Sequence, residues 1–448
     1  MRILMRAAVS PFTNPTAFQM LSKNMMGSNL GNLLFPYSIM RTLMTKDTEI
    51  DTISTVMRFD RKTIKKINSM YDFFVIPLAN AFRHSFIKEL ERLTVVVKKM
   101  KIPVAVVGVG TQIDYSKKER DEELDAAVIK FMKVVLKKTS IVGVRGEITA
   151  EYLKQLGFKE ERDFTVIGCP SMYIWGKKLP DINPKELTPD SAISLNSKIQ
   201  LSQKFHDFMY KTSQQIPNYI YVPQVIEEIY QMYLAMPYRE DFMKKKTKYF
   251  PVRGDHEVYK KDKALGFLNA KTWMDFLSER DLSVGSRIHG NIAAILAGTP
   301  CYIIVSDARI KELVNFHNIP HKLLNDLKKE DDIFKLYEKA DFSSIYRGHE
   351  ERFMHYLDFL RANGLDTIYD ENGDMKEESF FDKRINEIDF YEPVHPFVTL
   401  KIEEQMERME PFLKSYTSLN REKNINLGNH LGLFDGVIEN ASKWKNKR

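Results

Sequence analysis

The chain has 448 residues, of which 43% are hydrophobic and 11% aromatic, and its formal net charge is +7. This length exceeds one compact core and predicts two domains with extensions, while the hydrophobic share excludes a chain that is disordered throughout. No window approaches the roughly 20 consecutive apolar residues of a membrane-spanning helix, and the short N-terminal apolar run is interrupted by Arg6, so we expect no signal peptide. The two cysteines, Cys169 and Cys301, form no CxxC and predict no disulfide framework.

In the first half of the chain, short apolar runs bounded by Gly and Pro alternate with amphipathic stretches. Such runs are typical of buried parallel strands, and they cover residues 73–76, 103–110, 140–144 and 164–167. Helical patterns cover residues 122–137 and 149–156. The alternation predicts a parallel sheet with helices on both faces, and we assign residues 1–180 to an N-terminal Rossmann-like domain.

A polar stretch with three prolines at residues 174–191 indicates a domain boundary. A second alternating set follows, with strands at 192–195, 219–222, 282–284 and 301–305 and helices at 203–214, 227–234 and 270–277. Residues 190–345 are therefore assigned to a C-terminal Rossmann-like domain. Charge-rich helical patterns at 350–362 and 400–413 then predict a helical extension over residues 346–448. Its basic end, 443–448, is interpreted as a solvated tail, with contact to an anionic membrane surface as the alternative.

The first candidate binding motif is a turn rich in Gly and Asn at residues 26–34, which contains Asn29 and Asn32. A turn that opens a helix presents free N–H groups to a polar or anionic ligand, although a plain structural turn has the same pattern. The second motif, Gly108 to Gln112, ends a strand, and Gly110 there allows a ligand to approach the backbone. Because Ile113 stands at the last position of GxGxxG, this motif does not predict a dinucleotide site.

The third motif places Arg145 where a predicted strand ends and a helix begins. Ligands of open α/β sheets bind at the carboxyl ends of strands, and a guanidinium there can hold a carboxylate or phosphate through two hydrogen bonds. The structural alternative is pairing with Glu147 or the capping of a neighbouring helix.

The fourth motif is the most specific and contains Ser286, Arg287, His289 and Gly290. A strand ends at this point, and a helix with small residues follows and stops at Gly298. Arg287 and His289 are therefore predicted to lie together at a helix N-terminus, which attracts anions.

The chain carries no convincing metal or nucleic-acid motif. His317 and His321 have i, i+4 spacing, but Pro320 between them disrupts a helix, so we interpret both as surface histidines. Basic residues are spread along the chain without a recognisable nucleic-acid-binding pattern. We predict no metal and no cofactor.

Taken together, these motifs resemble the polysaccharide pyruvyltransferase family. The matching elements lie at residues 27–32, 144–149, 168–170, 286–290 and 297–300, within a region of about 15–325. The resemblance implies an α/β fold of two Rossmann-like domains facing a cleft, as in GT-B glycosyltransferases. It also implies transfer from phosphoenolpyruvate to sugar hydroxyls, with formation of a pyruvate ketal. Two positions depart from the family pattern, because Asn32 and Gly146 stand where the family usually carries acidic residues.

We therefore predict Arg287 and His289 as catalytic residues. Arg287 and the helix N-terminus would hold one anion of phosphoenolpyruvate, Arg145 would hold the other, and His289, with an ordinary pKa of about 6.5, would move a proton. Further substrate-binding candidates are Ser286, Gly290, Asn29, Asn32, Gly110 and Gln112.

The predicted partners are phosphoenolpyruvate and a glycan or lipid-linked sugar acceptor. The N-terminal domain is assigned to the acceptor side, and the C-terminal domain to the phosphoenolpyruvate side. We expect a cytoplasmic protein, with the inner face of the membrane as an alternative site. The alternative functions are a GT-B glycosyltransferase that uses a nucleotide sugar, and a sugar- or anion-binding protein without catalysis.

Overall fold

The computed structural model describes residues 1–54, 59–112, 121–236 and 249–421, with side chains up to residue 415. The position of Ile113 and the basic end at 443–448 lie outside the described residues. Within the described ranges, no helix is long and apolar enough to cross a membrane.

The N-terminal half contains a parallel sheet with the strand order β2-β1-β3-β4. The strands are β1 (Arg2–Arg6), β2 (Glu49–Ile53), β3 (Phe73–Pro77) and β4 (Val104–Val107). Two more parallel strands, β5 (Val142–Val144) and β6 (Phe164–Val166), continue the sheet through a bridge between Val109 and Val144. The surrounding helices are α1 (Ala17–Ser22), α2 (Leu34–Leu43), α3 (Arg61–Met70), α4 (Ile87–Lys99), α5 (Glu122–Val135) and α6 (Glu147–Gln155).

The C-terminal half repeats this arrangement in a second parallel sheet, with the order β11-β10-β9-β7-β8. Its strands are β7 (Ile193–Asn196), β8 (Tyr219–Tyr221), β9 (Leu282–Gly285), β10 (Cys301–Val305) and β11 (His321–Leu323). Its helices are α7 (Gln203–Gln215), α8 (Ile226–Leu234), α10 (Glu257–Lys260), α11 (Ala270–Ser278), α12 (Ile288–Leu296), α13 (Ala308–Phe316) and α14 (Ile333–Glu338). In both sheets the strand order reverses beside the first strand, and ligands of such sheets bind at that point.

The predicted strands and helices of both halves are present, with ends shifted by a few residues. The sequence analysis did not predict β2 or β11. β2 alternates exposed and less exposed residues, and β11 is half-exposed along its length, so neither forms a continuous apolar run. Both are edge strands, which need less apolar surface than the buried centre of a sheet.

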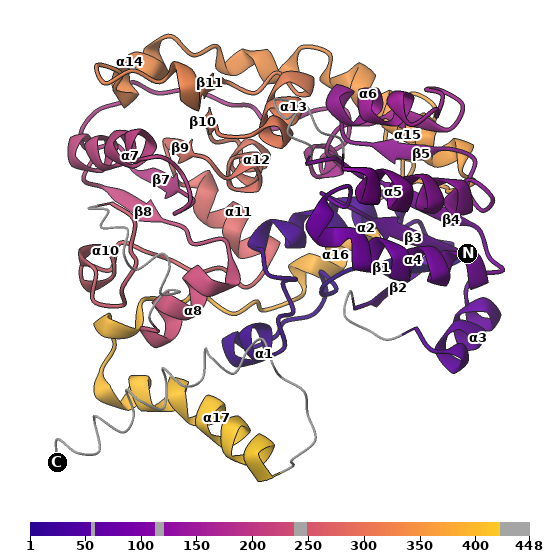
Figure 1. The fold of residues 1–448 in the computed structure, drawn as a ribbon. Coiled ribbons are helices and arrows are strands. Elements are labelled where there is room, and N and C mark those ends of the chain that lie inside the picture. Colours follow the sequence, from indigo (N-terminus) through magenta and orange to yellow (C-terminus); the bar gives the residue numbers. More distant parts are fainter. Residues whose placement is uncertain (55–58, 113–120, 237–248, 422–448) are drawn as a thin grey trace.

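The C-terminal extension returns over both halves. Its helices are α15 (His349–Ala362), α16 (Phe380–Asn386) and α17 (Ile402–Arg421). Phe359 of α15 packs on Gly143 of β5, and the Asn363 side chain accepts hydrogen bonds from Thr139 and Ser140. α16 packs on α2, and α17 packs on both α1 and α8 (Figure 1). The predicted fold is thereby confirmed: two Rossmann-like domains in a GT-B-like arrangement, with a helical C-terminal extension.

The two domains share hydrophobic packing. One buried cluster extends from β1 and α2 in the N-terminal half through α12 to α15 in the extension. Apolar burial of this kind stabilises the arrangement and fixes the mutual position of the domains. The carboxyl ends of the two sheets consequently stay close to each other.

Candidate active site

The turn at residues 26–34 brings the N-terminal domain against the start of α12. Leu30 N donates to Gln224 O over 2.8 Å, and Ile226 N donates to Ser28 O over 3.2 Å. A Cβ at Gly31 would lie only 2.6 Å from Cβ and Cγ of His289, so a glycine is needed for this close approach. The turn therefore forms one wall of a site whose other wall is the strand end and helix at 285–290.

His289 lies in the first turn of α12, between groups of both domains. Its ring meets that of Phe35 edge-on with 6.5 Å between the centroids, and its Nε2 is buried without a hydrogen-bond partner. Burial, followed by repulsion from Arg145, lowers the pKa of His289 to about 3. The ordinary pKa used in the sequence analysis is therefore wrong for the ligand-free protein, in which the imidazole is neutral.

The neutral state of His289 predicts a pH dependence of stability. The unfolded chain takes up the proton at about pH 6.5, whereas the native chain resists it until about pH 3. The contribution of His289 to the free energy of unfolding is therefore fully present above the unfolded pKa. It falls as the pH drops below that value, because the unfolded state then binds more protons. Urea unfolding of wild type and His289→Asn should show that the variant loses about 2 kcal/mol less between roughly pH 7.5 and pH 5. Equal losses in the two proteins would contradict this assignment.

Arg145 follows β5 and is 2% exposed. Its Nη1 donates to Asn80 Oδ1 over 3.0 Å, and its Cζ lies 5.6 Å from the centroid of the Phe35 ring. Its Nε and Nη2 are buried and have no partner, and the predicted alternative of pairing with Glu147 is not formed. Burying an unpaired charge is costly, so these two unpartnered nitrogens indicate a place for an anion.

Arg287 directly precedes α12, and its side chain is largely engaged by the protein itself. Its Nε donates to Ser197 O over 2.7 Å, and its Nη2 pairs with the buried Glu228 carboxylate over 2.7 Å. The backbone N of Arg287 donates to Asn196 Oδ1 over 2.7 Å. Within the described residues Nη1 has no partner. Arg287 thus ties α12 to β7 and to α8, and it offers a ligand fewer donors than Arg145 does.

The N-terminus of α12 has no side-chain cap, which leaves backbone N–H groups for a ligand. Ser286 is fully buried, and its Oγ has no partner. Ser197 Oγ and Gln224 Nε2 are also buried without partners, and the Gln224 amide packs directly on Gly290. Unsatisfied polar atoms are rare in native interiors, so their concentration here marks a ligand site.

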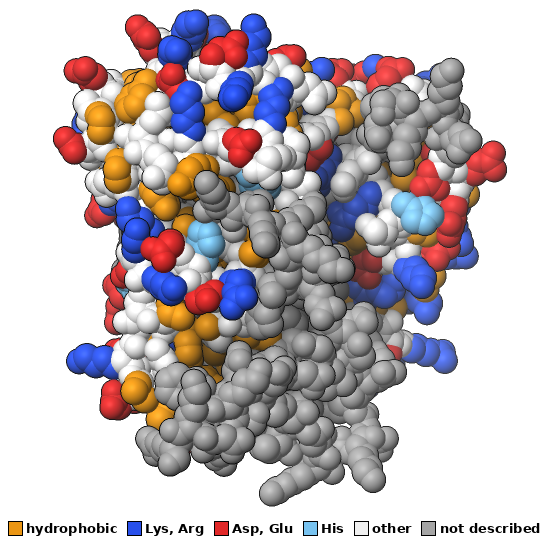
Figure 2. Space-filling model, turned by 60° about the vertical axis from the view of Figure 1, so that its left-hand side comes forward, with side chains coloured by type: hydrophobic (Ala, Val, Ile, Leu, Met, Phe, Trp, Pro, Cys, Tyr) orange, Lys and Arg blue, Asp and Glu red, His pale blue; other side chains and the backbone are white. Residues whose placement is uncertain are grey.

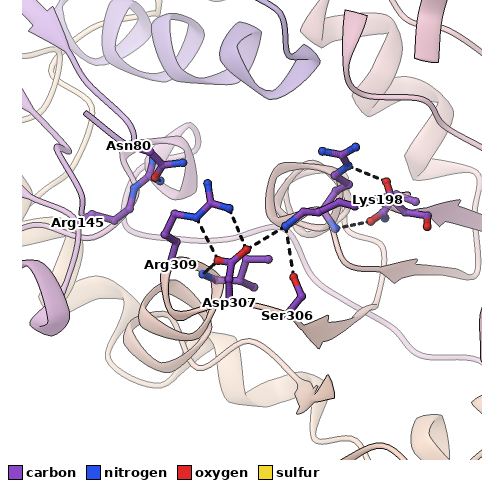
Figure 3. Close-up of polar contacts among 10 residues, drawn as sticks. Asn80, Arg145, Lys198, Ser306, Asp307 and Arg309 are labelled. Atoms are coloured by element: carbon purple, nitrogen blue, oxygen red, sulfur yellow. Dashed lines mark hydrogen bonds and ion pairs between the residues drawn. The ribbon is translucent and has the colours of Figure 1, made fainter. Parts of the chain in front are cut away.

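A further cationic group from the C-terminal domain completes the site (Figure 3). Lys198 Nζ lies 3.1 Å from Asp307 Oδ2 and 3.4 Å from Ser306 Oγ, and Arg309 Nη2 lies 2.9 Å from the same carboxylate. Burial lowers the pKa of Lys198 to about 8, although Asp307 opposes this shift. Burial works against ionisation of Asp307, but Lys198 and Arg309 outweigh it and lower its pKa to about 2.

Glu312 of α13 reaches across the interface to α6, whose N-terminus has no cap from its own segment. Its Oε1 accepts a hydrogen bond from Thr149 N over 2.7 Å, and its side chain fills the space beside Gly146. Burial raises the pKa of this carboxyl group, although its hydrogen bond and Arg145 oppose the shift. A carboxyl group from the other domain thus lies beside Gly146.

The remaining predicted residues have mostly structural surroundings. Asn29 Oδ1 accepts from Gly31 N over 2.9 Å, and Asn32 Nδ2 donates to Gly27 O over 2.9 Å. Gly110 packs against Cδ of Arg145, while Gln112 is exposed. The structure therefore brings Arg145, Ser286, Gly290 and His289 together, and Gln112 has no described contact with them.

A cavity of 240 Å³ lies next to this group, at the carboxyl ends of β1 and β3. Gly, Ala, Pro and Leu residues form much of its lining, and its polar and aromatic residues are Arg6, Asn32, Phe35, Asn80, Arg83 and Phe86. Figure 2 shows Lys and Arg side chains gathered in a hollow to the right of the centre. Among the described residues, no cluster of His, Cys, Asp or Glu could hold a metal ion. The prediction that no cofactor is needed stays a prediction.

Sequence reasoning missed Asn80, Lys198 and Arg309. Each lies three or four residues after the end of a predicted strand, so the rule that placed Arg145 at a strand end could also have found them. It also missed Gln224, whose loop has no motif of its own.

These features define a class: a GT-B-like protein of two α/β domains, with a cationic site between the carboxyl ends of its sheets. The chain belongs to the polysaccharide pyruvyl transferase family, whose sequence profile matches residues 29–308. The resemblance derived from the sequence motifs is thereby confirmed, and the family is one of transferases.

Solved structures with a similar chain path include sugar-nucleotide enzymes. The UDP-GlcNAc 2-epimerase of Methanocaldococcus jannaschii, in complex with UDP-GlcNAc and UDP, is 10% identical with a TM-score of 0.42 over 81% of this chain and 99% of that chain. The UDP-GlcNAc 2-epimerase of Neisseria meningitidis is 8% identical, with a TM-score of 0.40 over 81% and 100%. T4 phage BGT with its UDP-glucose substrate is 14% identical, with a TM-score of 0.32 over 82% and 100%. None of these likenesses bears on substrate or activity, and no curated protein matches the chain significantly.

Proposed function

We propose that this protein transfers a pyruvyl group from phosphoenolpyruvate to two hydroxyls of a sugar in a polysaccharide or its precursor, and that it forms a pyruvate ketal. The observation that carries the proposal is the unpartnered guanidinium edge of Arg145, which faces the same site as His289 and the uncapped N-terminus of α12. Phosphoenolpyruvate carries two anionic groups. One would bind at the N-terminus of α12 beside Ser286, and the other at Arg145.

His289 would supply and recover the proton. A bound trianionic donor offsets the burial and the Arg145 charge that keep the imidazole neutral, so donor binding raises its pKa. The imidazolium then protonates the methylene carbon of phosphoenolpyruvate, and the neighbouring carbon becomes electrophilic. Protonation thus becomes coupled to the presence of the donor.

The remaining bond changes take place at the electrophilic carbon. The electrophilic carbon forms bonds to two sugar oxygens, and its bond to the phosphate oxygen breaks with the electron pair leaving on phosphate. Of the two hydroxyl protons released, one returns to His289 and the other leaves with phosphate. The products are a pyruvate ketal and inorganic phosphate.

The test is release of phosphate from phosphoenolpyruvate in the presence of a panel of hexoses and hexosamines, with the ketal detected by mass spectrometry. We expect His289→Asn to lower the rate by about 10²–10⁴-fold, the usual contribution of a general acid–base group. Arg253→Gln, at an exposed ion pair with Asp255, is the matched control and should keep full activity. Turnover of nucleotide sugars instead of phosphoenolpyruvate, or full activity of His289→Asn, would overturn the proposal.

A further inference from the structure

The charged side chains that line the cavity at the carboxyl ends of β1 and β3 are all positive. The described residues that line it include two arginines, Arg6 and Arg83, and no aspartate or glutamate. Its volume of 240 Å³ lies below the range of about 300–1,000 Å³ that drug-sized ligands occupy, so it fits one sugar ring. A ring bound there would lie beside Phe35, whose edge contacts His289.

Arg6 is only partly neutralised. Its Nη2 donates to Glu89 Oε1 over 3.1 Å, but Glu89 also accepts two hydrogen bonds from Arg92, over 2.6 and 2.7 Å. One carboxylate thus serves two guanidinium groups. The Arg6 Nε is buried and has no partner, and burial lowers the pKa of this side chain.

Arg83 has no acidic partner within the part of the chain that the structure describes. Its Nε donates to Ser85 Oγ over 3.1 Å, its Nη1 donates to Asn80 O, and its Cζ lies 5.1 Å from the centroid of the Phe86 ring. Burial, and then repulsion from Arg309, lowers its pKa. A half-buried guanidinium bonded only to neutral groups keeps its full charge for a ligand.

The positive charge continues from this cavity to the donor site. Asn80 links the two, because its carbonyl accepts from Arg83 and its side chain accepts from Arg145. Figure 3 shows Arg145 and Asn80 on one side and Arg309 with its Asp307 partner on the other. The donor's anions are matched by Arg145 and the N-terminus of α12, which leaves Arg6 and Arg83 without an assigned anion.

We propose that the acceptor sugar itself carries a negative charge, as a carboxylate or a phosphate ester, and that this group binds at Arg6 and Arg83. The inference rests on the proposed function and names its acceptor class. A neutral sugar in this cavity would leave Arg83 without a counter-charge and Arg6 with only the carboxylate that it shares with Arg92. An anionic sugar supplies the missing counter-charge through charge-assisted hydrogen bonds.

Isothermal titration of the full chain with galactose, galacturonic acid and galactose 1-phosphate, each in the presence of phosphoenolpyruvate, tests the proposal. At least one anionic sugar should bind about tenfold or more tightly than galactose, in line with one charge-assisted hydrogen bond. A preference for galacturonic acid assigns the carboxylate, and a preference for galactose 1-phosphate assigns the phosphate. The preference should shrink in high salt, because screening weakens charge attraction.

Two variants tie the preference to the cavity. Arg83→Gln removes a charge without leaving any acid unpaired, and in Arg6→Gln the Glu89 carboxylate keeps Arg92. Each should lower affinity for the anionic sugar by about tenfold while leaving affinity for galactose unchanged. Arg83→Lys keeps the charge and should retain part of the preference, and Arg253→Gln should retain all of it.

Equal affinities for all three sugars, no binding of any of them, or an unchanged preference in both Gln variants would overturn this inference. The proposed function is judged separately, by whether phosphoenolpyruvate binds and loses affinity in Arg145→Leu. If phosphoenolpyruvate binds in this way but galactose binds more tightly than the anionic sugars, the proposed function stands and the anionic acceptor is rejected.

Discussion

Replacement of Arg145 by leucine is expected to lower kcat/KM for phosphoenolpyruvate by about 10³-fold, while the protein stays folded. The reason is that the Arg145 side chain is buried but makes few hydrogen bonds. The guanidinium is 2% exposed, yet its one hydrogen bond to another side chain goes to Asn80, and two of its nitrogens are buried without partners. A buried charge without partners destabilises the folded protein, and a bound anion offsets this cost.

Stability should therefore move in the opposite direction to activity. The free energy of unfolding of Arg145→Leu in urea should equal that of wild type or exceed it by about 1–2 kcal/mol, because an unpaired buried charge has been replaced by an apolar group. Asn80 lines the cavity, so its freed carbonyl can bind water instead. A loss of several kcal/mol in the variant would show that Arg145 is a structural residue and would contradict the assignment.

Replacement of Arg41 by methionine should give the reverse pattern, a loss of about 3 kcal/mol in the free energy of unfolding with unchanged affinity for phosphoenolpyruvate. Arg41 is also buried, but all of its nitrogens are bonded. Nε and Nη2 pair with Asp382, and Nη1 donates to Ile174 O over 2.6 Å and to Tyr369 Oη over 2.7 Å. These contacts hold α16 of the extension against α2, so their loss should weaken the packing of the extension on the N-terminal domain.

The control for this prediction is the pair of substitutions Arg41→Met and Asp382→Leu. Removing both charges leaves no unpaired carboxylate, and part of the lost stability should return relative to Arg41→Met alone. A double variant as unstable as the sum of the two single variants would show that the ion pair itself contributes little. Comparison of Arg41 with Arg145 thus separates a bonded structural arginine from one whose donors are free.

The sequence was sufficient for the elements that carry the site. Continuous apolar runs bounded by Gly and Pro identified the central strands, and the strand-end rule predicted the positions of Arg145, Arg287 and His289. The small residues after Gly290 correctly indicated a helix that packs closely on its sheet. These features depend on local pattern and on general rules of parallel sheets.

The rest depends on contacts between distant segments. The partner of Arg287 is Glu228, 59 residues away on another helix, and no spacing rule connects them. The depressed pKa of His289 arises chiefly from burial beneath the turn that contains Gly31 and beside Phe35 of α2, both in the opposite domain. The return of α15 to the N-terminal sheet likewise follows from tertiary packing rather than from the helical pattern itself.

The hydrogen bond that Thr149 N donates to Glu312 makes the stability of α6 depend on the contact between the two domains. Because the first turn of α6 is capped by a residue of the opposite lobe, parting the lobes exposes that turn, and loss of a helix cap costs about 1 kcal/mol. The first turn of α6 begins two residues after Arg145. Weakening the contact between the two domains is therefore expected to loosen the backbone that positions Arg145.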